Sequence, residues 1–230
     1  CFNGGRPEAD GTYSKRTKYG MIGVIIHEVG HNYFPMIINS DERQWTWMDE
    51  GLNTFLQYLT EQEFEKGYPS RRGPAYKIVN YMKGDKDRIS PIMTNSESIH
   101  QFGNNAYGKP ATALNILRET IMGRELFDHA FKVYANRWKF KHPTPNDVKR
   151  SAERVTGANL DWYLMDWSAT TNTIDYGIKD VKDNADATTV TLERIGRMPM
   201  PMDVLVEYTD GSKESFYIPL RMMSFEKENP

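Results

Sequence analysis

The run His-Glu-Val-Gly-His at residues 27–31 constrains the fold of this chain more than any other feature. Histidines four residues apart on a helix project from one face about one turn apart, so His27 and His31 can hold one zinc ion between them. Glu28 lies beside them, within reach of a water molecule on that ion. Glu50 follows after residues 32–49, and on a second helix it would complete a His, His, Glu ligand set.

Three protein ligands leave one position of a tetrahedral zinc ion open, which is typical of a catalytic site rather than a structural one. The pattern therefore predicts a zinc hydrolase site with His27, His31 and Glu50 as ligands. A pair of surface histidines on an ordinary amphipathic helix is the alternative, and the presence of Glu50 argues against it.

The first helix is expected over residues 17–34, because Pro35 disfavours helix in the residue before it. Apolar residues surround almost the whole cylinder, and this pattern predicts a buried helix. Gly23 and Gly30 would each cost about 1 kcal/mol in a helix interior. They suggest close approach of a neighbouring backbone, although plain packing explains them equally well.

The second helix is expected over residues 46–66, where Gly67 and Pro69 end it. Thr54 and Gln57 follow Glu50 by one and two turns and fall on the same side of this helix. Gln57 could accept a hydrogen bond from a zinc-bound histidine, or it could be a solvated surface residue.

The remaining helical segments are expected to have a structural role. Pro74 to Gly84 suggests a third helix, and residues 85–105 a long polar loop that leads to Tyr107. His100, His129 and His142 are expected to be surface or helix-end residues rather than ligands. Four further helices are expected, over residues 111–123, 125–138, 144–157 and about 159–167.

After about Thr171 the pattern changes from a helical period to alternation. Residues 189–192, 204–208 and 215–218 alternate as strands do, and Asp210-Gly211 is a strong hairpin signal. The chain is therefore expected to be mainly α with an appended β region, divided into residues 1–171 and 172–230. Three methionines near the strands are expected to fill packing gaps rather than bind metal: Met198, Met200 and Met202.

The phrase Trp-Met-Asp-Glu-Gly at residues 47–51, together with the spacing from His31 to Glu50, resembles the aminopeptidase N-like zinc metallopeptidases, a branch of the gluzincins. The resemblance extends from about Tyr19 to about Trp167. It implies that residues 1–171 are the helical lobe of a thermolysin-like zinc peptidase domain, whose N-terminal portion is missing. Residues 172–230 would be the first strands of the β-sandwich domain that follows.

The resemblance also implies the chemistry. One zinc ion would be held by His27, His31 and Glu50, and Glu28 would act as general base and then general acid. The family has a Tyr-x-Lys-Gly element whose tyrosine stabilises the transition state, and Tyr107 corresponds to it, with Pro110 in place of the glycine. From the sequence alone, Tyr107 could equally be a packing residue. The family commonly has Glu at the position of Gln57.

Two functions are therefore carried forward. The first is a zinc-dependent metallopeptidase that hydrolyses peptide bonds, as an aminopeptidase that removes N-terminal residues. The second is a non-catalytic binding module that keeps the fold, with or without the metal. The family binds the free amine of its substrate with a Gly-x-Met-Glu-Asn motif upstream of the zinc motif, and this sequence contains no such motif. This piece by itself is therefore expected to hydrolyse aminoacyl substrates very poorly.

Composition limits the partners. A net charge of −2 and a pI of about 6.3 give no reason to expect nucleic-acid binding. The single cysteine, Cys1, excludes an internal disulfide framework and a thiolate zinc cluster. No apolar run is long enough to span a bilayer.

Because the chain opens on Cys rather than Met, we expect a piece of a longer protein whose partners are peptide substrates and upstream domains of the same polypeptide. The sequence leaves the compartment open, with the periplasm or secretion as the expectation.

Overall fold

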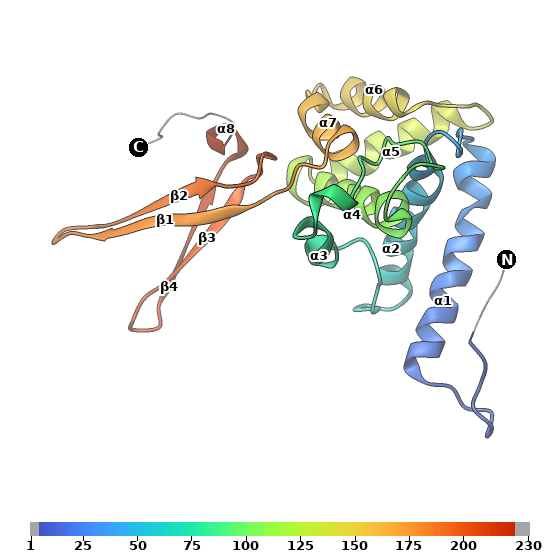
Figure 1. Ribbon diagram of the computed structural model, residues 1–230, viewed down its shortest axis with the longest axis horizontal. Coiled ribbons are helices and arrows are strands. Elements are labelled where there is room, and N and C mark those ends of the chain that lie inside the picture. Colours follow the sequence, from blue (N-terminus) through green and yellow to red (C-terminus); the bar gives the residue numbers. More distant parts are fainter. Residues whose placement is uncertain (1–4, 224–230) are drawn as a thin grey trace. The chain divides into compact units, whose positions relative to one another are not determined.

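The computed structural model describes residues 5–223. Contacts divide the chain into two compact units, Cys1–Thr171 and Asn172–Pro230, and each is described by itself. The first is helical and the second contains strands and one short helix (Figure 1), so the expected combination of helices with an appended β region is confirmed. In the described part of the chain, no helix combines the length and the apolar character needed to cross a membrane.

The helical unit contains seven α-helices among its described residues. They are α1 (Lys15–Gly30), α2 (Leu52–Phe64), α3 (Val79–Met82), α4 (Lys109–Ile116), α5 (Arg124–Trp138), α6 (Pro145–Thr156) and α7 (Asp161–Ala169). Single π-helical turns occur at Asn32–Ile37, Trp47–Gly51, Gly103–Gly108 and Leu117–Ile121, and short 3₁₀ turns at Ala75–Ile78 and Lys86–Arg88.

The signals that start and end helices were good predictors in the second half of this unit. Thr144 and Asp147 form the capping box that begins α6, and Gly157 ends it in the left-handed conformation, with φ of 68°. In the same way Gly123, with φ of 82°, separates α5 from the turn before it. The predicted bounds of these helices are confirmed to within a few residues.

The prediction for α1 was wrong in two respects. The regular helix ends at Gly30, and an irregular segment with extended backbone at Phe34 follows it. The helix is also not buried all round. Val29 is 63% exposed and Ile25 is 43% exposed, because within the described residues α1 packs mainly on α2, along one side (Figure 1). An apolar surface all round shows what a helix could bury, but not which neighbours are present to bury it.

Gly23 and Gly30 of α1 admit side chains of α2, not its backbone as expected. A Cβ atom on Gly30 would overlap Oδ1 of Asn53. A Cβ atom on Gly23 would lie 3.0 Å from Oε1 of Glu61 and 3.4 Å from Nε2 of Gln57. These positions let three polar side chains of α2 lie directly against α1.

We expect Gly30→Ala to destabilise the chain by about 1–3 kcal/mol, as overpacking of a filled site does. Asn53 has little freedom to move away, because its side chain is 1% exposed and its Nδ2 donates to the carbonyl of His27 over 2.8 Å. Chemical denaturation of the two proteins measures the difference.

Gly20→Ala is the matched control on the same helix. A Cβ atom there meets nothing within 4 Å, so the better helix propensity of alanine should stabilise the protein by about 1 kcal/mol. Stabilisation by both substitutions would show that the contact between Gly30 and Asn53 is not tight.

An aromatic cluster forms the core beneath these helices. Its members are Phe34, Phe55, Phe127, Phe131 and Tyr134, with ring centroids between 5.5 and 6.4 Å apart. Such pairs contribute about 0.5–1.5 kcal/mol each beyond the area that they bury. The cluster joins α2 and α5 to the segment after His31, and so fixes the end of α1 that carries the histidines.

The second unit consists of two separate antiparallel hairpins followed by α8 (Leu220–Met223), where one small sheet was expected. Strands β1 (Tyr176–Asp183) and β2 (Thr188–Arg194) pair from Tyr176↔Arg194 to Asp183↔Thr188, with an irregularity between Ile178 and Asp180. Strands β3 (Met202–Glu207) and β4 (Lys213–Ile218) pair in continuous register, joined through Gly211 with φ of 85°. Met198 and Met200 are buried, as packing residues are.

Candidate active site

Three side chains predicted as ligands converge at the C-terminal end of α1. His27 and His31 lie one turn apart there, and Glu50 comes from the turn that leads into α2. Nε2 of His27 lies 3.0 Å from Oε2 of Glu50, and Nε2 of His31 lies 3.1 Å from the same atom of His27. Nε2 of His31 and Oε2 of Glu50 are 3.3 Å apart. The side chains are 13%, 20% and 17% exposed, in the order of their numbers.

This triangle has the dimensions of a zinc site. Bonds of about 2.0–2.1 Å to a tetrahedral zinc ion place neighbouring ligand atoms roughly 3.3 Å apart. The three atoms here are 3.0 to 3.3 Å apart, and two imidazoles with one carboxylate are the donor set of a catalytic site. Within residues 5–223 these are the only three potential ligands whose donor atoms gather in this way. The donor set therefore fits zinc.

The other nitrogen of each imidazole has a partner of its own. Nδ1 of His27 lies 2.9 Å from Oε1 of Gln57, and Nδ1 of His31 lies 2.8 Å from the carbonyl oxygen of Phe34. Both partners are acceptors, so each Nδ1 is the donor nitrogen and each Nε2 is the nitrogen that would give its lone pair to a metal ion in the triangle. This contact favours the acceptor role for Gln57 over that of a solvated surface residue.

The electrostatics of the triangle favour a cation. Burial raises the pKa of Glu50, but hydrogen bonds from the two imidazoles and from Tyr107 outweigh burial and lower the pKa to about 2. Asp49, with Oδ1 3.0 Å from Nδ1 of His31, and then Glu50 raise the pKa of His31 to about 10. Two carboxylates facing two imidazoles create a negative potential that a metal cation would also satisfy.

Tyr107 also contacts Glu50. It lies within the helical turn Gly103–Gly108, not in the loop before a helix as expected, and its hydroxyl donates to Oε1 of Glu50 over 2.6 Å. Close packing next to Glu50 makes this possible, because a Cβ atom on Gly51 would lie only 2.5 Å from Cγ of Pro110. Burial and then Glu50 raise the pKa of Tyr107, so the phenol stays protonated and acts as a donor at neutral pH.

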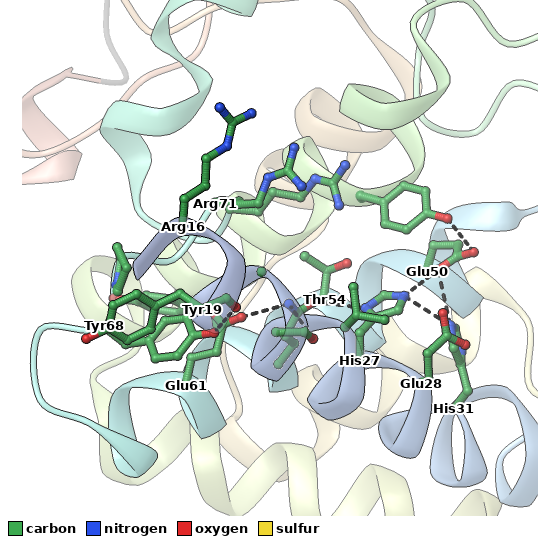
Figure 2. Close-up of a pocket in the computed structure, with 18 of the residues that line it drawn as sticks. Arg16, Tyr19, His27, Glu28, His31, Glu50, Thr54, Glu61, Tyr68 and Arg71 are labelled. Atoms are coloured by element: carbon green, nitrogen blue, oxygen red, sulfur yellow. Dashed lines mark hydrogen bonds and ion pairs between the residues drawn. The ribbon is translucent and has the colours of Figure 1, made fainter. Parts of the chain in front are cut away.

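Figure 2 shows the cavity onto which these residues open. Its volume is about 1160 Å³, and Glu28 lines it together with the three predicted ligands and Tyr107. A cationic wall adjoins them: Arg16, Arg71 and Arg72 also line the cavity, and no ion pair with a carboxylate forms at these arginines among the described residues. The guanidinium of Arg72 lies 4.5 Å from the ring centroid of Tyr107, a cation–π contact that holds that ring in place.

Sequence reasoning missed four residues of this site. Asp49 belongs to the motif at residues 47–51, but no role was predicted for it. Glu61 follows Gln57 by one helical turn, a spacing that could have revealed their contact. Asn53 supports α1 through the carbonyl of His27. Arg72 had no signal, because it lies in an irregular segment after α2 that only tertiary structure brings back to Tyr107.

Curated proteins resemble this chain over about two thirds of its length. It is 25% identical over 165 residues to a probable aminopeptidase 1 of Sulfurisphaera tokodaii, a match that covers 69% of this chain and 21% of that protein. It is also 25% identical over 166 residues to the glutamyl aminopeptidase of Sus scrofa, covering 70% of this chain and 17% of that protein. The chain thus spans about a fifth of the length of these relatives.

Solved structures show the same fold. The M1 zinc metallopeptidase of Deinococcus radiodurans superposes with a TM-score of 0.52 at 21% identity, over 68% of this chain and 34% of that one. The aminopeptidase A of Legionella pneumophila, solved with aspartic acid, gives a TM-score of 0.60 at 15% identity, over 93% of this chain and 25% of that one. The Legionella match covers enough of the chain to include strands as well as the helical unit, and it supports the predicted fold, a helical lobe followed by strands.

The family model described as the peptidase family M1 domain matches residues 8–167. This segment holds every residue of the triangle, Glu28 and Tyr107, and it covers more than half of the chain. The chain therefore belongs to peptidase family M1, as the resemblance of its zinc motif predicted.

Proposed function

We propose that this chain carries the zinc site of an aminopeptidase, with His27, His31 and Glu50 as the ligands of one zinc ion. The observation that carries the proposal is the triangle of ligand atoms, 3.0 to 3.3 Å apart, at a cavity that also holds Glu28 and Tyr107. Residues 1–171 would be the helical part of the catalytic domain, and residues 172–230 the start of a β-sandwich domain. A binding module that does not turn over substrate would have no role for Glu28 beside the metal.

Zinc held at this site would supply Lewis-acid chemistry, by activating water and polarising the carbonyl of a peptide bond. Glu28 follows His27 directly on α1 and lines the cavity beside the triangle. From there its carboxylate would take a proton from the attacking water and deliver it to the leaving amine. Tyr107, a protonated donor that already reaches Glu50, would hydrogen-bond the oxygen on which negative charge develops.

Removal of N-terminal residues, rather than cleavage within a chain, rests on the relatives. The curated relatives quoted above are aminopeptidases. The test is a metal analysis of the purified chain, followed by assays of the whole protein on aminoacyl reporters and on the same reporters with an acetylated amine. One zinc per chain with hydrolysis of the free-amine reporters alone supports the proposal. Zinc without turnover of either reporter would favour the binding module.

Tyr107→Phe should lower kcat on the order of 10²-fold and change KM much less, because its hydrogen bond to the developing oxyanion forms mainly in the transition state. The phenylalanine ring keeps the contact with Arg72 and the stacking beside His27, whose centroid lies 5.8 Å away. Steady-state kinetics on an aminoacyl reporter measure the effect. Tyr13→Phe, at an exposed tyrosine outside the cavity, is the control. An effect of Tyr107→Phe confined to KM would assign Tyr107 to substrate binding instead.

A further inference from the structure

A buried carboxylate, Glu61, connects to the candidate metal site through one intervening side chain. Nε2 of Gln57 donates to Oε1 of Glu61 over 2.7 Å, and Oε1 of the same Gln57 lies 2.9 Å from Nδ1 of His27. Glu61 and Gln57 both come from α2, one turn apart, so Glu61, Gln57 and His27 form a continuous chain of hydrogen bonds. Figure 2 labels the two ends of this chain, Glu61 and His27.

The surroundings of Gln57 fix the orientation of its amide group. Its nitrogen faces two acceptors, the carboxylate of Glu61 and the carbonyl oxygen of Gly23, which lies 3.2 Å away. If the amide were flipped, its oxygen would face these two acceptors and its nitrogen would face His27. The Glu61 contact therefore directs Oε1 of Gln57 toward His27, which must then carry its proton on Nδ1 and present Nε2 to the metal.

The structure holds Glu61 in this place. Its residue is only 3% exposed, and its second oxygen, Oε2, accepts a hydrogen bond of 2.5 Å from Ser70. Gly23 of α1 provides the space, since a Cβ atom there would approach Oε1 of Glu61 to 3.0 Å. Burying a carboxylate is unfavourable unless it is hydrogen-bonded, and both oxygens of Glu61 are. If the side chain at position 61 only filled space, an apolar residue could do so without needing hydrogen-bond partners.

A metal-bound histidine commonly donates its other N–H to a carboxylate, which orients the ring and increases its basicity. Here the immediate acceptor is a neutral amide, and the carboxylate lies one helical turn further along α2. We propose that Glu61 is a positioning residue that acts through Gln57: it orients the amide and polarises it, and so sets the ring of His27 for zinc. This inference rests on the proposed zinc site.

The test is zinc affinity, measured by competition with a chelator of known strength. The variants are Glu61→Gln, the control Glu63→Gln on the exposed part of the same helix, and the exchange Gln57→Glu/Glu61→Gln. The exchange keeps one carboxylate and one amide but places the carboxylate directly against His27. In the zinc-loaded protein, the NMR signal of the His27 Nδ1 proton reports its hydrogen bond independently of activity.

Glu61→Gln should weaken zinc binding about 10- to 100-fold, the range found for partners of metal-bound histidines, and shift the His27 Nδ1 proton signal. Glu63→Gln should change neither, and the exchange should restore most of the affinity. A merely structural role for Glu61 would not be rescued by moving its charge, so failure of the exchange together with an unshifted proton signal overturns the inference. So does Glu61→Gln with the affinity of the parent. A parent chain that binds no zinc is a separate result, which overturns the proposed function and this inference with it.

Discussion

Glu28→Gln is expected to leave zinc binding unchanged while it lowers kcat by up to about 10⁴-fold in the whole protein, the upper range for loss of a general base. The amide keeps the size and shape of the carboxylate but cannot accept the proton of the attacking water. Glu28 is not one of the three predicted ligands, which are His27, His31 and Glu50. The zinc content of Glu28→Gln should therefore equal that of the parent. Steady-state kinetics with parallel metal analysis separate these two properties.

The control for this prediction is Glu125→Gln, which makes the same chemical change at an exposed position of α5. Its kcat should match that of the parent. If Glu28→Gln turned over substrate at an undiminished rate, the proton would be carried by another group. Loss of zinc in Glu28→Gln would instead show that the carboxylate supports the ligands rather than the chemistry.

Local spacing was the part of the site that the sequence could predict. The positions of His27, Glu28 and His31 relative to one another depend only on helix geometry, so they followed from a run of five residues. Glu50 was expected as the third ligand from its position after the motif, and the resemblance to known proteins strengthened that expectation. In the structure Glu50 comes from the turn at Trp47–Gly51 that leads into α2, and α2 packs on α1. Tyr107 required the same resemblance, because packing of Pro110 on Gly51 brings it to the site.

The failures also have physical causes. The exposure of Val29 and Ile25 follows from which neighbours cover α1, and no pattern within the helix contains that information. Strand β1 escaped prediction because its sequence, Tyr-Gly-Ile-Lys-Asp-Val-Lys-Asp, has too few apolar residues in alternation to give a clear signal. By contrast the hairpin between β3 and β4 was predictable, because its turn needs the positive φ that Gly211 adopts.

His31→Ala is expected to have the largest effect on zinc itself. It removes one of three ligands and leaves Nε2 of His27 and Oε2 of Glu50, which are 3.0 Å apart, to hold the ion alone. The loss of affinity should therefore exceed the roughly 10- to 100-fold range of changes to residues that only support ligands. Chelator competition measures it, and inactivity toward aminoacyl reporters should accompany it.

The same substitution should disturb the fold much less than it disturbs zinc binding. His31 contributes a hydrogen bond to the carbonyl of Phe34 and an ion pair with Asp49, over 2.8 and 3.0 Å. Its removal leaves Asp49, which is 7% exposed, without that imidazole, so some stability is lost. His129→Ala, at an exposed histidine of α5 outside the site, should change neither property. Zinc affinity in His31→Ala equal to that of the parent would show that the ligand assignment is wrong, because no other gathered set of ligands exists within residues 5–223 to replace it.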